Sequence, residues 1–270
     1  MLTLVDMWQP DIREYLNASK QRLQGGAIQR TIDRLWQVLV EIFSLPDPPT
    51  NPRFEYLRHL ASQMRGQTVV TLNYDDALEH MAYSTTFRID SDPFPQPLSG
   101  TVARLNAPLR LVKLHGSLNW SRDNISGDVE ALPPMQSFRH SQEPWTGHTP
   151  GIIFGAGNKL RPDGPFLALY QQFLEALAAA QQVVIIGYSF RDAHVNEAIR
   201  RWILYQASED GLLRVGDVGD DLQPIVKSWI DQRSLDVEYI RGPAEETMKE
   251  LIAPRPQLLK PKRPSTNSSQ

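Results

Sequence analysis

Three apolar runs, each followed at once by a cluster of polar residues, dominate the hydrophobic pattern of the chain. They are VVTLNYDDALEH at 69–80, LVKLHGSLNW at 111–120 and VVIIGYSFRDAHVNEAI at 183–199. Short apolar runs with β-branched residues predict buried strands of a parallel sheet. Ligands of open α/β sheets bind beyond the carboxyl ends of such strands. We therefore expect the polar residues at these ends to share one rim of one sheet. These residues are Asn73, Asp75, His115 and Ser189.

The rest of the pattern predicts helices between further strands, as in an α/β fold. The expected helices cover 11–24, 27–45, 53–64, 166–180, 222–233 and 243–252, with one more after Asp192, which would cap it. The expected strands cover 68–72, 109–114, 152–154, 182–186, 212–218 and 235–240. Residues 84–108 and 121–150 show little periodicity and predict long irregular loops, which are often functional.

A glycine-rich segment, IIFGAGNKLRPDG at 152–164, looks at first like a phosphate-binding loop. Such a loop must open directly into a helix whose first amides face the phosphates. Here the run Arg161-Pro162-Asp163-Gly164-Pro165 holds the chain in turns, and the next helix begins too late. We interpret the segment as a strand followed by a glycine loop at the rim of the sheet.

Composition indicates one globular domain without unusual partners. The chain has 270 residues, of which 41% are hydrophobic, and we expect a single domain over 1–253 with a disordered tail or linker at 254–270. A net charge of −3 gives no electrostatic reason to bind nucleic acid or a membrane. No cysteine is present, and no apolar stretch is long enough to span a membrane. We expect a cytoplasmic protein.

Each polar cluster, taken alone, has an ordinary structural explanation. Asp75 or Asp76 would cap the next helix, and a histidine beside glycine often lies in a turn. Asp192 would likewise cap a helix after a tight turn. Three such strand ends on one rim nevertheless predict one composite site. Because an imidazole acts as a base near neutral pH, His115 is the candidate base.

The segments TLNYD, KLHGS and GYSFRD, in this order and spacing, resemble the sirtuin-like NAD-binding domain. The resemblance covers roughly residues 65 to 240. It is closest to the bacterial branch without a zinc ribbon, whose members include NAD-hydrolysing antiphage effectors. The segment FGAGNKLRPDGPF is also typical of that branch.

The resemblance implies a Rossmann-like, mostly parallel sheet flanked by helices, with NAD bound as substrate across the strand ends and no metal. It implies two catalytic residues, Asn73 and His115. The amide would orient the nicotinamide or a water molecule, and the imidazole would be the base beside the nicotinamide ribose. The residues implied to bind the remainder of NAD are Asp75, Gly116, Ser117, Gly187, Tyr188, Ser189 and Asp217.

The resemblance lacks the family's first motif, a strand that ends in a glycine-rich GAGxS-type loop and cradles the pyrophosphate. No such motif precedes residue 65, and Gly25-Gly26 lies between two expected helices. A charge-assisted hydrogen bond contributes roughly 1.5–3 kcal/mol, so the loss of two or three would weaken NAD binding by orders of magnitude. We expect either an N-terminally incomplete domain or a domain that lacks half of its cofactor cradle.

Three functions remain open. The first is hydrolysis of NAD to nicotinamide and ADP-ribose, with antiphage defence as the role that family analogy implies. The second is a catalytically degenerate module that binds NAD or ADP-ribose, or mediates assembly. The third is an NAD-dependent protein deacylase, which the absence of zinc-ribbon cysteines disfavours. The partners implied besides NAD are a second copy of the chain or a fused or separate sensor domain.

Overall fold

The computed structural model describes most of the segments that carry the predicted site. The described residues are 34, 38, 52–64, 66–83, 89–90, 109–123, 126–131, 148–153, 164–208, 211–233 and 235–253. The expected helices at 11–24 and 27–45 therefore lie outside the description, apart from residues 34 and 38, which are both helical. Most of the loop at 84–108, the glycine loop at 154–163 and the tail at 254–270 lie outside it as well.

The first parallel sheet contains the first two predicted motif strands. Its order is β1-β3-β2, formed by β1 (Thr68–Thr71), β3 (Leu109–Lys113) and the short β2 (Ile89–Asp90). The 3-10 turn η1 (Pro52–Phe54) and α4 (Glu55–Gln63) precede it, and α5 (Ala77–Tyr83) follows β1. The expected helix at 53–64 and the strands at 68–72 and 109–114 are thus confirmed.

An antiparallel sheet occupies the region for which we expected an irregular loop. Its order is β5-β4-β6, formed by β4 (Gly116–Asp123), β5 (Val129–Ala131) and β6 (His148–Ile152). The expectation of an irregular segment over 121–150 was therefore wrong for the described residues. We did not predict β4 because it carries polar side chains, although most of this strand is buried on both of its faces.

The second parallel sheet follows the expected α/β alternation. Its order is β7-β8-β9, formed by β7 (Gln182–Ile186), β8 (Leu212–Asp217) and β9 (Asp236–Arg241). The surrounding helices are α6 (Phe166–Ala179), α7 (Ala193–Arg201) with its π-helical extension η5 (Trp202–Gln206), α8 (Pro224–Ile230) and α9 (Ala244–Ile252). Each of these helices and strands was predicted within a few residues.

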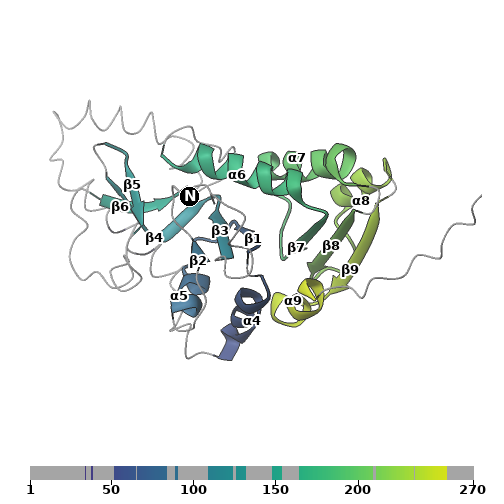
Figure 1. Ribbon diagram of the computed structural model, residues 1–270, viewed down its shortest axis with the longest axis horizontal. Coiled ribbons are helices and arrows are strands. Elements are labelled where there is room, and N and C mark those ends of the chain that lie inside the picture. Colours follow the sequence, from purple (N-terminus) through teal and green to yellow (C-terminus); the bar gives the residue numbers. More distant parts are fainter. Residues whose placement is uncertain are drawn as a thin grey trace, which may run out of the picture.

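The expected single sheet is divided in two among the described residues. Among the residues that the structure describes, β1 pairs only with β3 and β7 pairs only with β8, so the two parallel sheets are separate there. Helices connect them. Figure 1 shows α6 and α7 along one side of both sheets and α4, α5 and α9 along the other. The fold is therefore mixed α/β, with parallel sheets flanked by helices.

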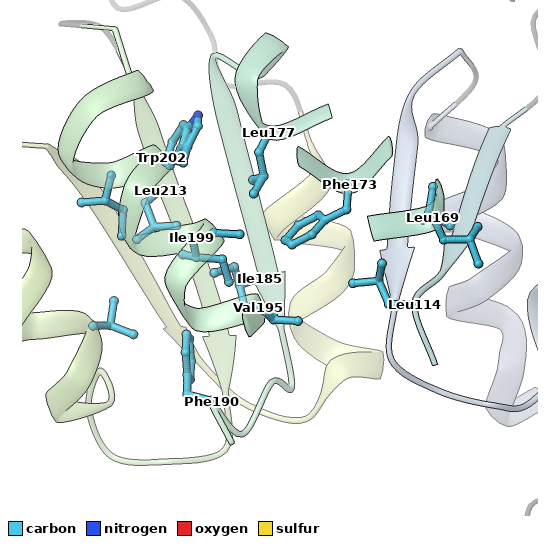
Figure 2. Close-up of a cluster of buried hydrophobic side chains, with 14 of the residues drawn as sticks. Leu114, Leu169, Phe173, Leu177, Ile185, Phe190, Val195, Ile199, Trp202 and Leu213 are labelled. Carbon is cyan, nitrogen blue, oxygen red and sulfur yellow. The ribbon is translucent and has the colours of Figure 1, made fainter. Parts of the chain in front are cut away.

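One apolar core extends from the first parallel sheet to the second. On α6, the buried residues recur at helical spacing and face inward, and they are Phe166, Leu169, Phe173 and Leu177. Figure 2 shows Phe173 between Leu114, which follows β3, and Ile185 of β7. Full burial of such a side chain contributes roughly 1.5–3 kcal/mol, so α6 fastens the two sheets together. No described helix is both long enough and apolar enough to cross a membrane.

Candidate functional site

The loop after β1 is held in place by its own side chains. The backbone N–H of Asn73 donates to Thr71 Oγ1 at 3.1 Å. Asn73 itself is exposed. Asp75 Oδ1 accepts a hydrogen bond from the Ala77 backbone at 3.1 Å, so this carboxylate caps α5. The Tyr74 hydroxyl donates to the Ile153 carbonyl at 2.7 Å. These hydrogen bonds hold the loop, and Asn73 is exposed on it.

The turn between β3 and β4 carries His115, which is almost completely buried, with 2% of its surface exposed. Gly116 follows with φ of +86°, and a Cβ there would lie 1.9 Å from the Gly151 carbonyl oxygen. Only glycine fits this close approach. A structural role thus accounts for Gly116, whose predicted contact with NAD stays a prediction.

A buried polar cluster lies directly beneath these two loops. Lys113 Nζ donates to Glu79 Oε1 at 2.9 Å, to the Asp75 carbonyl and to the Ser117 hydroxyl, and Ser117 in turn donates to Asn119 Oδ1. None of the surface of Ser117 is exposed. The structure therefore places Ser117, a predicted NAD contact, inside this cluster, which links β3, β4 and the loop after β1.

Sequence reasoning overlooked Lys113 and Glu79. The available signal was a lysine within the apolar run LRLVKL, because a lysine is almost never fully buried unless it is paired. Burial raises the pKa of Glu79 above its usual value of 4.5, while the nearby Lys113 opposes this increase.

The loop after β7 has an unusual but well-supported backbone. Gly187 has φ of +62° and Phe190 has φ of 54°, a left-handed conformation that is uncommon for a phenylalanine. The Asn196 side chain stabilises it, since Nδ2 donates to the Phe190 carbonyl at 2.8 Å and Oδ1 accepts from the Tyr188 hydroxyl at 2.8 Å. Strained backbone of this kind gathers at functional sites. Ser189, between them, is exposed.

Tyr188 and Phe190 form the apolar base of the same loop. Their ring centroids lie 4.6 Å apart, and Phe190 also packs on Trp229 at 6.2 Å. Burial, and next to it the negative charge of Asp192, raises the pKa of the Tyr188 phenol. Tyr188 is therefore a neutral hydrogen-bond donor at physiological pH, and its hydroxyl is occupied by the loop itself.

His115 is the point at which the three motifs meet. Its ring centroid lies 6.3 Å from that of Tyr74, in the first motif, and 6.2 Å from that of His194, in the third. Its Nε2 atom lies 3.7 Å from Asp192 Oδ1. Asp192 occupies the predicted N-cap position of α7, although its side chain makes no capping hydrogen bond there.

Asp217 lies at the end of β8, where its contacts are local. Its carboxylate accepts hydrogen bonds from the Val218 backbone at 2.7 Å and from the Gln223 side chain at 3.3 Å. The carboxyl ends of β7 and β8 are joined, because the Gly187 amide donates to the Gly216 carbonyl at 2.9 Å. The strand ends of the second sheet are thus joined, and the predicted contact of Asp217 with NAD stays a prediction. Among the described residues, no three His, Cys, Asp or Glu side chains are grouped as metal ligands would be.

A family model for the SIR2-like domain matches residues 67–210, which is more than half of the chain. The chain belongs to the SIR2-like family. The matched range begins just before β1 and ends after the π-helical turn η5, so all three motifs of this SIR2-like domain lie within it. The resemblance inferred from TLNYD, KLHGS and GYSFRD is confirmed at the level of the family.

Several solved structures of Sir2 proteins are similar to this SIR2-like chain. A structure of a Sir2 enzyme is 12% identical, with 85% of this chain and 79% of that chain covered and a TM-score of 0.47. A Sir2 homologue in complex with NAD is 16% identical, with 87% and 75% covered and a TM-score of 0.48. A Sir2 homologue variant in complex with ADP-ribose is 16% identical, with 85% and 75% covered and a TM-score of 0.47. No curated protein matches the sequence.

Proposed function

We propose that this SIR2-like domain binds NAD and hydrolyses the bond between nicotinamide and ribose, which yields nicotinamide and ADP-ribose. The observation that carries the proposal is the position of His115, in contact with the rings of Tyr74 and His194 and near the carboxylate of Asp192. His115 lies where the loops that follow three strands meet. This position makes it the candidate general base of the SIR2-like domain.

The reaction places modest demands on the protein, because nicotinamide is already a good leaving group. The exposed amide of Asn73 would orient the nicotinamide carboxamide or the attacking water. The water oxygen forms a bond to the anomeric carbon as the bond to nicotinamide breaks. His115 would take the proton that the water, or a ribose hydroxyl, gives up. Burial keeps bulk water away from the imidazole.

The loop after β7 would bind the substrate beyond the reacting centre. A Cβ at Gly187 would meet no described atom within 4 Å, so the surface there is open to a ligand. Ser189 is exposed beside it and offers a hydroxyl to a phosphate or ribose oxygen. The same proposal places the chain in the NAD-hydrolysing bacterial branch, as a single cytoplasmic domain over 1–253. It also includes a role in antiphage defence, which rests on family analogy.

The test is direct. The full chain is incubated with NAD, and nicotinamide release is followed by chromatography. General acid–base catalysis contributes about 10²–10⁴-fold, so His115→Ala should lower the rate on that order. Asn73→Ala should lower it as well. His148→Ala is the matched control: it removes another imidazole, which is exposed on β6 and hydrogen-bonded to Ser121, and it should leave the rate unchanged. Equal rates in wild type and His115→Ala would overturn the assignment.

A second candidate function is binding of NAD or ADP-ribose without turnover. The observation that favours it is the complete burial of Ser117, which removes one of the expected ligand contacts from the surface. Calorimetry with ADP-ribose distinguishes the two candidates. Micromolar binding together with no nicotinamide release would support the binding module, and measurable turnover would exclude it.

A further inference from the structure

Asp192 is placed to act on His115. Its Oδ1 atom lies 3.7 Å from His115 Nε2, and the exposed fractions of the two side chains are 12% and 2%. Asp192 is the N-cap residue of α7, where an aspartate normally caps the helix through its side chain, but here no such capping hydrogen bond is made. The Asp192 carboxylate therefore lies near the His115 imidazole, and helix capping alone does not explain this orientation.

The backbone carbonyl of Asp192 accepts two hydrogen bonds, which limits where its side chain begins. Its carbonyl accepts a hydrogen bond from the Asn196 amide at 2.9 Å and from the Tyr188 hydroxyl at 3.2 Å. Both donors belong to the network that supports the left-handed Phe190. His115 is anchored as well, because its carbonyl accepts from the Ile153 amide at 2.8 Å.

We propose that Asp192 is a positioning residue for His115. Its carboxylate favours the tautomer with the proton on Nε2, in which Nδ1 is the basic nitrogen of the ring. When Nδ1 takes the proton released by water or by a ribose hydroxyl, the carboxylate of Asp192 stabilises the resulting imidazolium. The separation of 3.7 Å exceeds a hydrogen bond, and such contacts often tighten only when substrate is bound. The catalytic part of this inference rests on the proposed function.

The tautomer of His115 is measurable without any activity. Long-range proton–nitrogen correlation spectra of the 15N-labelled chain report which ring nitrogen carries the proton. The sequence has six histidines, so the His115 signals are identified by their loss in His115→Gln. In wild type we expect the Nε2-protonated form. In Asp192→Asn and Asp192→Ser, the ring nitrogen shifts should move toward the other tautomer or a mixture. Both replacements are good helix caps, so α7 keeps its N-terminus.

The kinetic comparison separates positioning from folding. Asp192→Asn should lower kcat for NAD on the order of 10–100-fold with little change in KM, a part of what acid–base catalysis supplies. Asp192→Glu, which restores a carboxylate, should recover more activity than Asp192→Asn. Glu197→Gln is the matched control, because it removes an exposed carboxylate from the same helix and should change neither the spectrum nor the rate.

Two results would overturn the inference: ring signals of His115 that are identical in wild type and Asp192→Asn, or an unchanged kcat in that variant. If the wild-type chain releases no nicotinamide, the proposed function fails by itself, and the ring signals still decide whether Asp192 sets the state of His115.

Discussion

The Lys113 ammonium lies 2.9 Å from Glu79 Oε1, and both groups are buried, with exposed fractions of 1% and 7%. The same ammonium donates to the Asp75 carbonyl and to the Ser117 hydroxyl. One cation thereby joins α5, the loop that carries Asn73 and the strand that follows His115. The geometry of the candidate site depends on this buried pair, although neither partner is placed to touch a substrate.

Removal of one member of the pair should be costly. Lys113→Met leaves Glu79 as a buried carboxylate without its cation, and breaking a buried pair in this way costs about 3–5 kcal/mol in the free energy of unfolding. Urea denaturation measures this change. The double variant Lys113→Met, Glu79→Met should regain much of the loss, because apolar pairs often replace buried ion pairs without penalty. Lys227→Met, at an exposed pair, is the control. A double variant no more stable than Lys113→Met would contradict the argument.

The stability of the fold should carry a pH signature from Glu79. Burial raises the pKa of this carboxyl in the folded state above 4.5, so the folded chain binds the proton more readily than the unfolded chain. Its contribution to stability is therefore present below pH 4.5 and lost as the pH rises through the raised pKa. Urea denaturation of wild type and Glu79→Gln across this range isolates the effect. The wild type should lose stability relative to the variant as the pH rises; the opposite slope would mean that Lys113 outweighs the cost of burial.

The limits of sequence reasoning are visible in β4. The strand β7 was expected and found at 182–186, because its apolar run has no competing interpretation. In β4, Ser117 and Asn119 alternate with Leu118 and Trp120, yet both sets are buried. The polar face is not at the surface, since it binds the Lys113 cluster. Periodicity alone does not reveal a polar face whose partners are contributed by other elements.

The candidate site, too, could be predicted from the sequence only in part. That residues from the ends of the three motif strands lie close together could be predicted, because parallel strands end at one edge. The proximity of His115 and Asp192 could not, since it depends on how α7 packs against the turn after β3. For Asp192, local sequence indicated only a helix cap. The division into two parallel sheets among the described residues agrees with the missing first motif, because the strand that carries this motif is usually internal to such a sheet.

Arg214 should be the most important cation of the second sheet. It is 3% exposed, and its guanidinium donates to Glu238 at 2.8 Å and to the carbonyls of Glu250, Leu251 and Ala253 at the end of α9. Arg214→Met should lower the free energy of unfolding by about 1.5–3 kcal/mol, since it removes the charged hydrogen bonds to Glu238 and to the last carbonyls of α9. Calorimetric or urea unfolding measures the loss.

Two further variants test whether the geometry or the charge of Arg214 is responsible for its contribution to stability. Arg214→Lys keeps the charge but lacks the planar fork, so its stability should lie between those of wild type and Arg214→Met. Arg241→Met removes an arginine from the exposed pair with Asp220 and should have little effect. If Arg214→Lys is as stable as wild type, the forked contacts to the α9 carbonyls contribute nothing.

Gly187 and Gly116 both have positive φ, but only at Gly187 is there room for a side chain. A Cβ at Gly187 would meet no described atom within 4 Å, whereas at Gly116 it would lie 1.9 Å from the Gly151 carbonyl. Gly187→Ala should therefore cost only the left-handed strain, about 1–2 kcal/mol. Gly116→Ala should cost more, because the backbone of β6 must move. Unfolding in urea should rank the two variants in this order.

The Gly187→Ala variant also tests whether a ligand occupies the open space beside Gly187. If ADP-ribose lies against this backbone, the methyl group of Gly187→Ala should weaken its binding, as measured by calorimetry on the folded variant. Gly127→Ala is the matched control: it has φ of +79°, its nearest atom is an Arg122 side-chain nitrogen at 3.8 Å, and it lies between β4 and β5. It should show similar strain with unchanged binding. Equal affinities of the two variants would remove Gly187 from the binding surface, and the open space would then reflect only a tight turn between β7 and α7.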